Sequence, residues 1–117
     1  MYWGGEYMEH QSQQTTIYVG LNDSETGVQR FDSEKYISVL KNACRLYNVA
    51  FSVQEISGGY YHEDGSYTEE NTLMLTLIDV PEQIIREIAK ELCAFFHQES
   101  VMVTFTSTTA IYVNGSI

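Results

Sequence analysis

Aromatic and acidic side chains that could bind a cation or move a proton are concentrated at residues 60–70, near the middle of the chain. The candidate binding residues are Tyr60, Tyr61, His62, Glu63, Asp64, Glu69 and Glu70. Carboxylates attract basic partners, whereas tyrosine and histidine can donate or accept a proton. No lysine or arginine occurs between Arg45 and Arg86, so the segment keeps its negative charge. The pattern predicts an acidic binding surface.

The charge of the whole chain points the same way. Its 117 residues include 16 acidic and 6 basic side chains, which gives a formal net charge of −10. This balance argues against binding to nucleic-acid phosphates and against docking on an anionic membrane surface. We therefore expect the partner to be a basic protein surface, and neither nucleic acid nor a membrane.

Two kinds of function agree with such a surface. The first is a small binding protein that acts through protein–protein contact, such as a phage or mobile-element inhibitor that occupies the nucleic-acid groove of a host nuclease or defence protein. The second is a small-molecule-binding protein or cofactor-free enzyme of the dimeric ferredoxin-like barrel type, with Tyr18, Tyr60, Tyr61 or His62 as acid or base. The acidic tip could also do no more than protect an edge strand from aggregation. We expect the first function, with no catalytic residue and no cofactor assigned.

Other pairings of reactive side chains predict structure rather than chemistry. Cys93 and His97 stand four residues apart on an expected helix, but the thiol lies on its apolar side. Two cysteines and three histidines do not supply a zinc site at a recognisable spacing, and the acidic segment lacks the regular spacing of a calcium loop. No metal ligand is therefore predicted. Cys44 also falls on an apolar helix side, so two unpaired thiols indicate a reducing cytoplasm.

The alternation of apolar residues gives an order of elements that would position these side chains. Strands are expected at residues 15–21, 50–61, 67–80 and 101–106, helices from Ser33 and from Pro81, and a short last strand at 110–113. The order β-α-β-β-α-β predicts an α+β ferredoxin-like domain, with two helices on one face of an antiparallel sheet. We expect residues 15–117 to form this domain and residues 1–14 to be a mobile arm. The arm lacks the pattern of a secretory signal, and no apolar run is long enough to span a membrane.

The central hairpin allows a prediction of register. Asp64-Gly65 is typical of a two-residue turn. That turn would set Leu75 opposite Gln54, whereas a shift by one residue sets Leu75 opposite Val53 and buries apolar pairs. The shift needs one extra residue in the first strand, so we expect a β-bulge at Gly58-Gly59.

The sheet face turned away from the helices is expected to mix apolar and polar side chains. Its residues are Tyr18, Gln54, Ile56, Met74, Thr76, Met102 and Thr104. A face of this kind often meets another subunit or a ligand. We therefore expect a homodimer.

Three short segments resemble a bacterial family of small ferredoxin-like proteins catalogued only as a domain of unknown function. The family shares a Tyr-x-Gly-Leu start, a Gly-aromatic hairpin strand and a Gln-Glu-Ser-Val step into the last long strand. These fall here on residues 18–21, 59–60 and 98–101, and the similarity covers about residues 15–113. Many members are exported, whereas this chain shows no signal. The family carries no established active site, so the resemblance implies a fold but assigns no functional residue.

Overall fold

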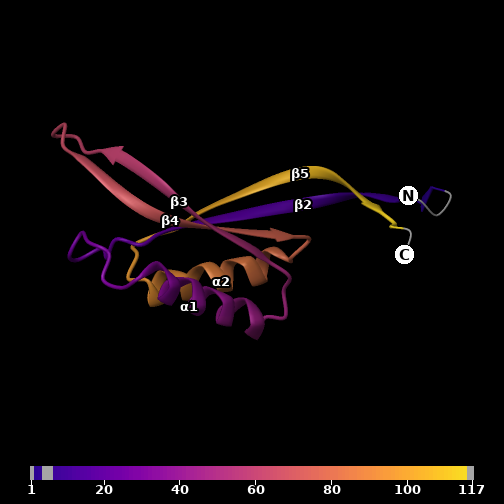
Figure 1. The fold of residues 1–117 in the computed structure, drawn as a ribbon, viewed down its shortest axis with the longest axis horizontal. Coiled ribbons are helices and arrows are strands. Elements are labelled where there is room, and N and C mark those ends of the chain that lie inside the picture. Colours follow the sequence, from indigo (N-terminus) through magenta and orange to yellow (C-terminus); the bar gives the residue numbers. More distant parts are fainter. Residues whose placement is uncertain (1, 4–6, 116–117) are drawn as a thin grey trace.

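The protein forms one antiparallel sheet that is covered on one side by two helices (Figure 1). The structure is a computed structural model that describes residues 2–3 and 7–115. The elements in chain order are β1 (Tyr2–Trp3), β2 (Tyr7–Gly20), α1 (Ser33–Leu46), β3 (Ser52–Tyr61), β4 (Tyr67–Ile78), α2 (Glu82–Phe95) and β5 (Met102–Val113). Residue 1 and residues 4–6, which belong to the predicted mobile arm, lie outside the described residues.

The sheet has the strand order of a ferredoxin-like domain. β2 lies at its centre, with β4 on one side and β5 on the other, and β3 pairs with β4. The short β1 pairs with the start of β2. The four long strands and two helices follow the order β-α-β-β-α-β, which confirms the predicted fold class.

The core lies between the sheet and the helices, because every second residue of the central strands faces α1 and α2. The strands contribute Ile17, Val19, Leu73, Leu75 and Leu77, and the helices contribute Leu40, Cys44, Ile85, Ile88 and Leu92, each at most 1% exposed. Full burial of one such side chain stabilises a fold by about 1.5–3 kcal/mol. The centre of the sheet is therefore held by apolar contact.

Both helices begin within one residue of the predicted positions. α1 starts at Ser33, and Asn48 ends it in the left-handed region at φ 54°, a conformation that asparagine tolerates better than most residues. α2 starts at Glu82, with Pro81 in the preceding cap position. Among the described residues, neither helix is long and apolar enough to cross a membrane.

The two ends of the domain differ from the prediction. β2 begins at Tyr7 instead of residue 15, and β5 runs unbroken to Val113, so there is no separate short strand at 110–113. These segments pair with each other along their whole length, up to Tyr7↔Val113. Residues 7–14 and 107–109 are mostly polar and lack the apolar alternation that marks a strand, so backbone hydrogen bonding between β2 and β5 must hold them as strands. Residues 7–14 are therefore a strand and not an arm without secondary structure.

The hairpin of β3 and β4 has the predicted register but no bulge. Val53 pairs with Leu75, and the pairing continues without interruption to Tyr61↔Tyr67. Gly58 and Gly59 form ordinary pairs within this ladder. The predicted bulge at these glycines is therefore wrong.

The extra residue that the register requires lies in the turn between β3 and β4. His62 N–H donates to the Ser66 carbonyl at 2.8 Å, and Gly65 N–H donates to the His62 carbonyl at 3.0 Å. These bonds enclose a three-residue loop in which Gly65 has φ 87°, the left-handed conformation that such loops require. A three-residue turn shifts the register by one residue, which leaves both strands regular.

The molecule is elongated. Its radius of gyration is 17.2 Å and its extents are 58 × 31 × 29 Å, whereas a compact domain of this length has a radius of gyration of about 13 Å. Figure 1 shows two ribbons that project beyond the helices in opposite directions: the β3–β4 hairpin, and the outer part of β2 and β5. Two-stranded ribbons bury little apolar area by themselves.

Candidate functional site

A polar pocket lies where three segments from distant parts of the chain meet. The β3–β4 hairpin forms one wall, loop 22–30 after β2 forms the second, and the link from α2 to β5 forms the third. The lining residues are Asn22, Asp23, Ser24, Gly27, Tyr60, His62, Thr68, Glu70, Gln98, Glu99 and Ser100. The volume of about 530 Å³ is in the range of small-molecule sites.

Strand alternation divides the predicted binding residues between two faces of the hairpin. Tyr60, His62 and Glu70 line the pocket together. Tyr61 and Glu69 are neighbours of these residues along the strands, so their side chains point to the opposite face. The structure therefore assembles part of the predicted set into one site and excludes the rest from it.

The Glu70 carboxylate is held in a defined position. Its Oε2 accepts the backbone N–H of Asn22 at 2.9 Å. The carboxyl group also lies directly against Gly20, where an added Cβ would come within 2.5 Å of it. Glycine at this point of β2 therefore leaves the space that the carboxylate occupies.

An aromatic pair stands beside this carboxylate. The rings of Tyr60 and His62 meet edge to face, with centroids 5.1 Å apart. His62 Nε2 lies 2.7 Å from Thr68 Oγ1, a hydrogen bond whose direction depends on the tautomer. The hairpin wall thus carries the aromatic rings of Tyr60 and His62 beside the Glu70 carboxylate. Aromatic rings and an anion together suit a cationic ligand.

The tip of the hairpin is a separate surface. Asp64 Oδ1 accepts hydrogen bonds from Ser66 Oγ at 2.6 Å and from Ser66 N–H at 2.9 Å, and these bonds hold the pKa of Asp64 below its ordinary value. Glu63 is exposed beside it. The rings of Tyr61 and Tyr67 contact each other at 5.0 Å, with the two residues 76% and 52% exposed. The tip is therefore acidic, aromatic and open to solvent.

Sequence reasoning missed the other two walls. The sequence offered no functional signal at residues 22–27, and residues 98–101 were named only for a family resemblance. Gln98 Nε2 donates to the Asn22 carbonyl at 2.5 Å, and Ser24 N–H donates to the His97 carbonyl at 2.9 Å. The Gln98–Asn22 bond joins positions 76 residues apart, so no local pattern could reveal it.

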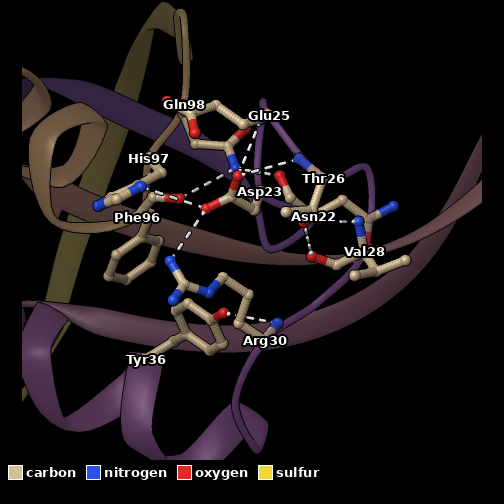
Figure 2. Close-up of polar contacts among 10 residues, drawn as sticks. All are labelled: Asn22, Asp23, Glu25, Thr26, Val28, Arg30, Tyr36, Phe96, His97 and Gln98. Carbon is tan, nitrogen blue, oxygen red and sulfur yellow. Dashed lines mark hydrogen bonds and ion pairs between the residues drawn. The ribbon is translucent and has the colours of Figure 1, made fainter.

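Asp23 is the buried charge at the centre of the loop wall (Figure 2). Its Oδ1 accepts the N–H groups of Glu25 at 2.8 Å and Thr26 at 3.2 Å. Its Oδ2 lies 3.2 Å from His97 Nδ1 and 3.6 Å from Arg30 Nη1. The Glu25 amide contributes most to lowering the pKa of Asp23, and the Thr26 amide, His97 and Arg30 add to it against the opposing effect of desolvation. This carboxylate is therefore charged at neutral pH.

A serine, a histidine and an aspartate meet at a second place, without the geometry of a nucleophile. Ser12 Oγ donates to Asp79 Oδ2 at 3.0 Å, and His10 Nε2 lies 3.8 Å from the same oxygen. The aspartate stands between the other two groups, whereas an activated serine needs the histidine next to it. The contact fastens β2 to the end of β4.

The predicted pair of Cys93 and His97 is divided between two surroundings. Cys93 lines an apolar groove beside β5, whereas His97 faces Asp23. Cys44 is buried, and burial raises the pKa of its thiol to about 11. Both cysteines are free. Within residues 2–3 and 7–115, no three histidine, cysteine or acidic side chains are grouped so that they could hold a metal ion.

Comparisons with known proteins identify the fold through structure alone. No protein-family model matches the sequence, and no curated protein does either. A phage SAM lyase in its apo state superposes with a TM-score of 0.64 at 19% identity, over 90% of this chain and 91% of that chain. A phage SAM lyase in complex with S-methyl-5′-thioadenosine gives 0.58 at 19% identity, over 97% and 94%. The GlnK–ATP complex of B. subtilis gives 0.56 at 12% identity, over 84% and 82%.

Proposed function

We propose that this chain is a SAM lyase that binds S-adenosylmethionine in the polar pocket and releases S-methyl-5′-thioadenosine. The observation that carries the proposal is the lining of the pocket: Glu70 and Glu99 supply carboxylates, Tyr60 supplies an aromatic ring, and no lysine or arginine is among the described lining residues. The likeness in fold to a lyase that holds S-methyl-5′-thioadenosine supports the choice of ligand. The proposal corresponds to the second of the two functions that the sequence allowed, a small-molecule-binding protein or cofactor-free enzyme.

The charge of the substrate favours this pocket. S-adenosylmethionine carries a sulfonium cation, and a cation loses solvation in a pocket unless anionic or aromatic groups replace the water. A carboxylate about 4 Å from a cation near a protein surface attracts it by roughly 4 kcal/mol. The Glu70 carboxylate, which the Asn22 amide holds in place, is the group that we assign to the sulfonium.

The reaction needs no cofactor. Release of S-methyl-5′-thioadenosine breaks the bond between the sulfonium sulfur and the four-carbon amino-acid chain, and the sulfur keeps the electron pair and becomes neutral. As this bond breaks, either the carboxylate of the same chain attacks the carbon that the sulfur leaves, which gives a lactone, or the neighbouring carbon loses a proton, which gives an alkene. On the second route His62 is the candidate base. Loss of the positive charge also weakens the hold of the pocket on the sulfur, which favours product release.

To test the proposal, the purified chain is incubated with S-adenosylmethionine, and the S-methyl-5′-thioadenosine that it releases is measured by chromatography. We expect wild-type protein to release it and Glu70→Gln to release it at least about tenfold more slowly, the effect of removing one charged contact of 1.4 kcal/mol. Glu69→Gln is the matched control, because it removes the same charge from the opposite face of the hairpin. Absence of release by wild type, together with absence of binding in calorimetry, would refute the proposal.

A second candidate function follows from the hairpin tip. Glu63 and Asp64 stand outside the pocket beside exposed tyrosines, so the tip could bind a basic protein such as a host nuclease or defence protein, as a phage or mobile-element inhibitor would. Charge steering would make this association salt-dependent. Capture of a nucleic-acid-binding protein from host lysate at low salt, lost at high salt and in the double variant Glu63→Lys/Asp64→Lys, would support it. Capture that is unaffected by the charge reversal would exclude the tip as the binding surface.

We also propose a homodimer in the cytoplasm. Tyr18, Ile56 and Met74 are only half-buried and Met102 is 58% exposed, and a second copy would cover this face of the sheet. Two free cysteines suit a reducing compartment. The mass of the particle in analytical ultracentrifugation tests the dimer, and a monomer at micromolar concentration would contradict it.

A further inference from the structure

We infer that Asp23 is a positioning residue for the pocket: it fixes the backbone amide of Asn22, and this amide orients the Glu70 carboxylate. The inference rests on the proposed function for its effect on the substrate. Asn22 joins Asp23 and Glu70, because it precedes Asp23 in the chain and donates its backbone N–H to Glu70 Oε2.

The loop wall depends on a few polar contacts for its shape. Residues 22–30 contain no helix and no strand beyond the isolated bridge Asn22↔Gln29. Backbone bonds link Asp23 N–H to the Val28 carbonyl at 2.9 Å and Gly27 N–H to the Asp23 carbonyl at 2.8 Å. A segment of this kind is free to move unless side chains fix it.

The two carboxylate oxygens of Asp23 contact different parts of the structure. Oδ1 accepts the amides of Glu25 and Thr26 and so closes the loop on itself. Oδ2 faces His97 and Arg30 and so ties the closed loop to the end of α2 (Figure 2). Because the carboxylate is 4% exposed, water cannot easily replace these partners.

The fixed loop then presents its first amide to the pocket. A glutamate side chain has several free torsions, and a single amide donor selects the rotamer that faces it. Gly20 provides the space for that rotamer. Asp23 therefore determines where the negative charge of Glu70 stands, without contributing its own carboxylate to the same position.

A double-mutant cycle tests the inference in the full chain. Affinity for S-adenosylmethionine is measured for wild type, Asp23→Asn, Glu70→Ala and the double variant. If Asp23 acts through Glu70, Asp23→Asn weakens binding about tenfold in the wild-type background and less than about twofold when residue 70 is already alanine. Equal effects in both backgrounds would overturn the inference. Asp32→Asn is the matched control, since it removes the same charge from an exposed helix cap that makes no side-chain cap bond.

Hydrogen exchange of the Asn22 amide gives a readout that needs no ligand. We expect this amide to exchange about tenfold faster in Asp23→Asn than in Asp32→Asn, because loss of the loop anchor frees it from Glu70. An unchanged exchange rate would overturn the positioning role even if the protein binds its substrate. Faster exchange together with no binding of S-adenosylmethionine by wild type would uphold the positioning role and reject the proposed function.

Arg30→Gln is a milder variant in case Asp23→Asn unfolds. It removes one partner of Oδ2 and leaves the buried carboxylate and its amide contacts in place. The same direction of change in Asn22 exchange, at smaller amplitude, is expected. No change in this variant, combined with an unfolded Asp23→Asn, would contradict the inference.

Discussion

The centre of the sheet and the pocket end of the sheet are stabilised by different kinds of contact. At the centre, Leu75 and its neighbours are fully buried between β4 and the helices. At the pocket, one buried carboxylate and a few hydrogen bonds hold a loop against two other segments. Apolar contact tolerates changes of detail but needs volume, whereas hydrogen bonds need the right atoms in the right places. Stability and site geometry should therefore respond to different substitutions.

The largest effect is expected at the centre. Leu75→Ala removes a side chain that is 0% exposed and should lower the free energy of unfolding by about 2–5 kcal/mol. Leu46→Ala makes the same chemical change at a position that is 76% exposed and should change it by less than about 0.5 kcal/mol. Urea unfolding of both variants measures the difference. Similar losses of unfolding free energy in the two variants would contradict the placement of Leu75 in the core and of Leu46 on the surface.

Gly20→Ala should have the opposite effect, a small loss of stability and a large loss of binding. The new Cβ would meet the end of the flexible Glu70 side chain, so the carboxylate can move aside and the free energy of unfolding should fall by only about 1 kcal/mol, the value of one hydrogen bond. Under the proposed function, binding of S-adenosylmethionine should weaken about tenfold or more, since 1.4 kcal/mol of lost contact corresponds to that factor. Gly58→Ala is the control, because its Cβ would meet only an ordinary contact at 3.8 Å. Full affinity of Gly20→Ala in calorimetry would show that the position of the Glu70 carboxylate does not matter for binding.

Acid should loosen the polar end before it affects the apolar centre. The amide of Glu25 lowers the pKa of Asp23, and the amide of Gln13 lowers that of Asp79. A carboxyl group with a lower pKa in the folded protein stabilises the fold above its unfolded pKa, near 3.8 for these residues, and loses that contribution as the pH falls further. Stability should therefore fall below about pH 4. Asp23→Asn should reduce this loss while Asp32→Asn should not, and identical acid profiles for the two variants would argue against Asp23 as a source.

The smallest effect is expected at the thiols. Burial raises the pKa of Cys44 to about 11, so its reactive thiolate is nearly absent at pH 8, whereas Cys93 is partly exposed. Iodoacetamide at that pH should label Cys93 in the native chain and label Cys44 only after denaturation. Mass spectrometry of the peptides shows which thiol reacted. Rapid native labelling of Cys44 would mean that the helix layer opens readily.

The sequence was sufficient for the elements whose side chains alternate or recur with helical spacing. The leucines of β4 predicted the hairpin register, and the apolar stripe of α1 predicted a helix whose start the cap residues Asp32 and Ser33 indicated. Residues 7–14 of β2 and residues 107–109 of β5 could not be predicted in the same way, because these polar segments are strands only by pairing with each other. The bulge was mispredicted because Asp64-Gly65 suggested a two-residue turn, whereas His62 and Ser66 close a three-residue one.

The candidate site was predictable only in its hairpin wall. Tyr60, His62 and Glu70 stand together in sequence, and alternation alone separates them from Tyr61 and Glu69. The loop and the link that complete the pocket are brought to the hairpin by the fold, over long sequence separations. A single sequence carries no pattern that joins such segments.

The pairing of Tyr7 with Val113 brings both ends of the described chain to the tip of one ribbon, and Figure 1 places that tip opposite the β3–β4 hairpin. In a molecule 58 Å long, an affinity tag, a fluorophore or a fused domain on either end would sit far from the pocket. Immobilisation on a sensor surface through either terminus would leave the site facing the solution. Two labels, one on each terminus, would report whether the ribbon frays, independently of any event at the pocket.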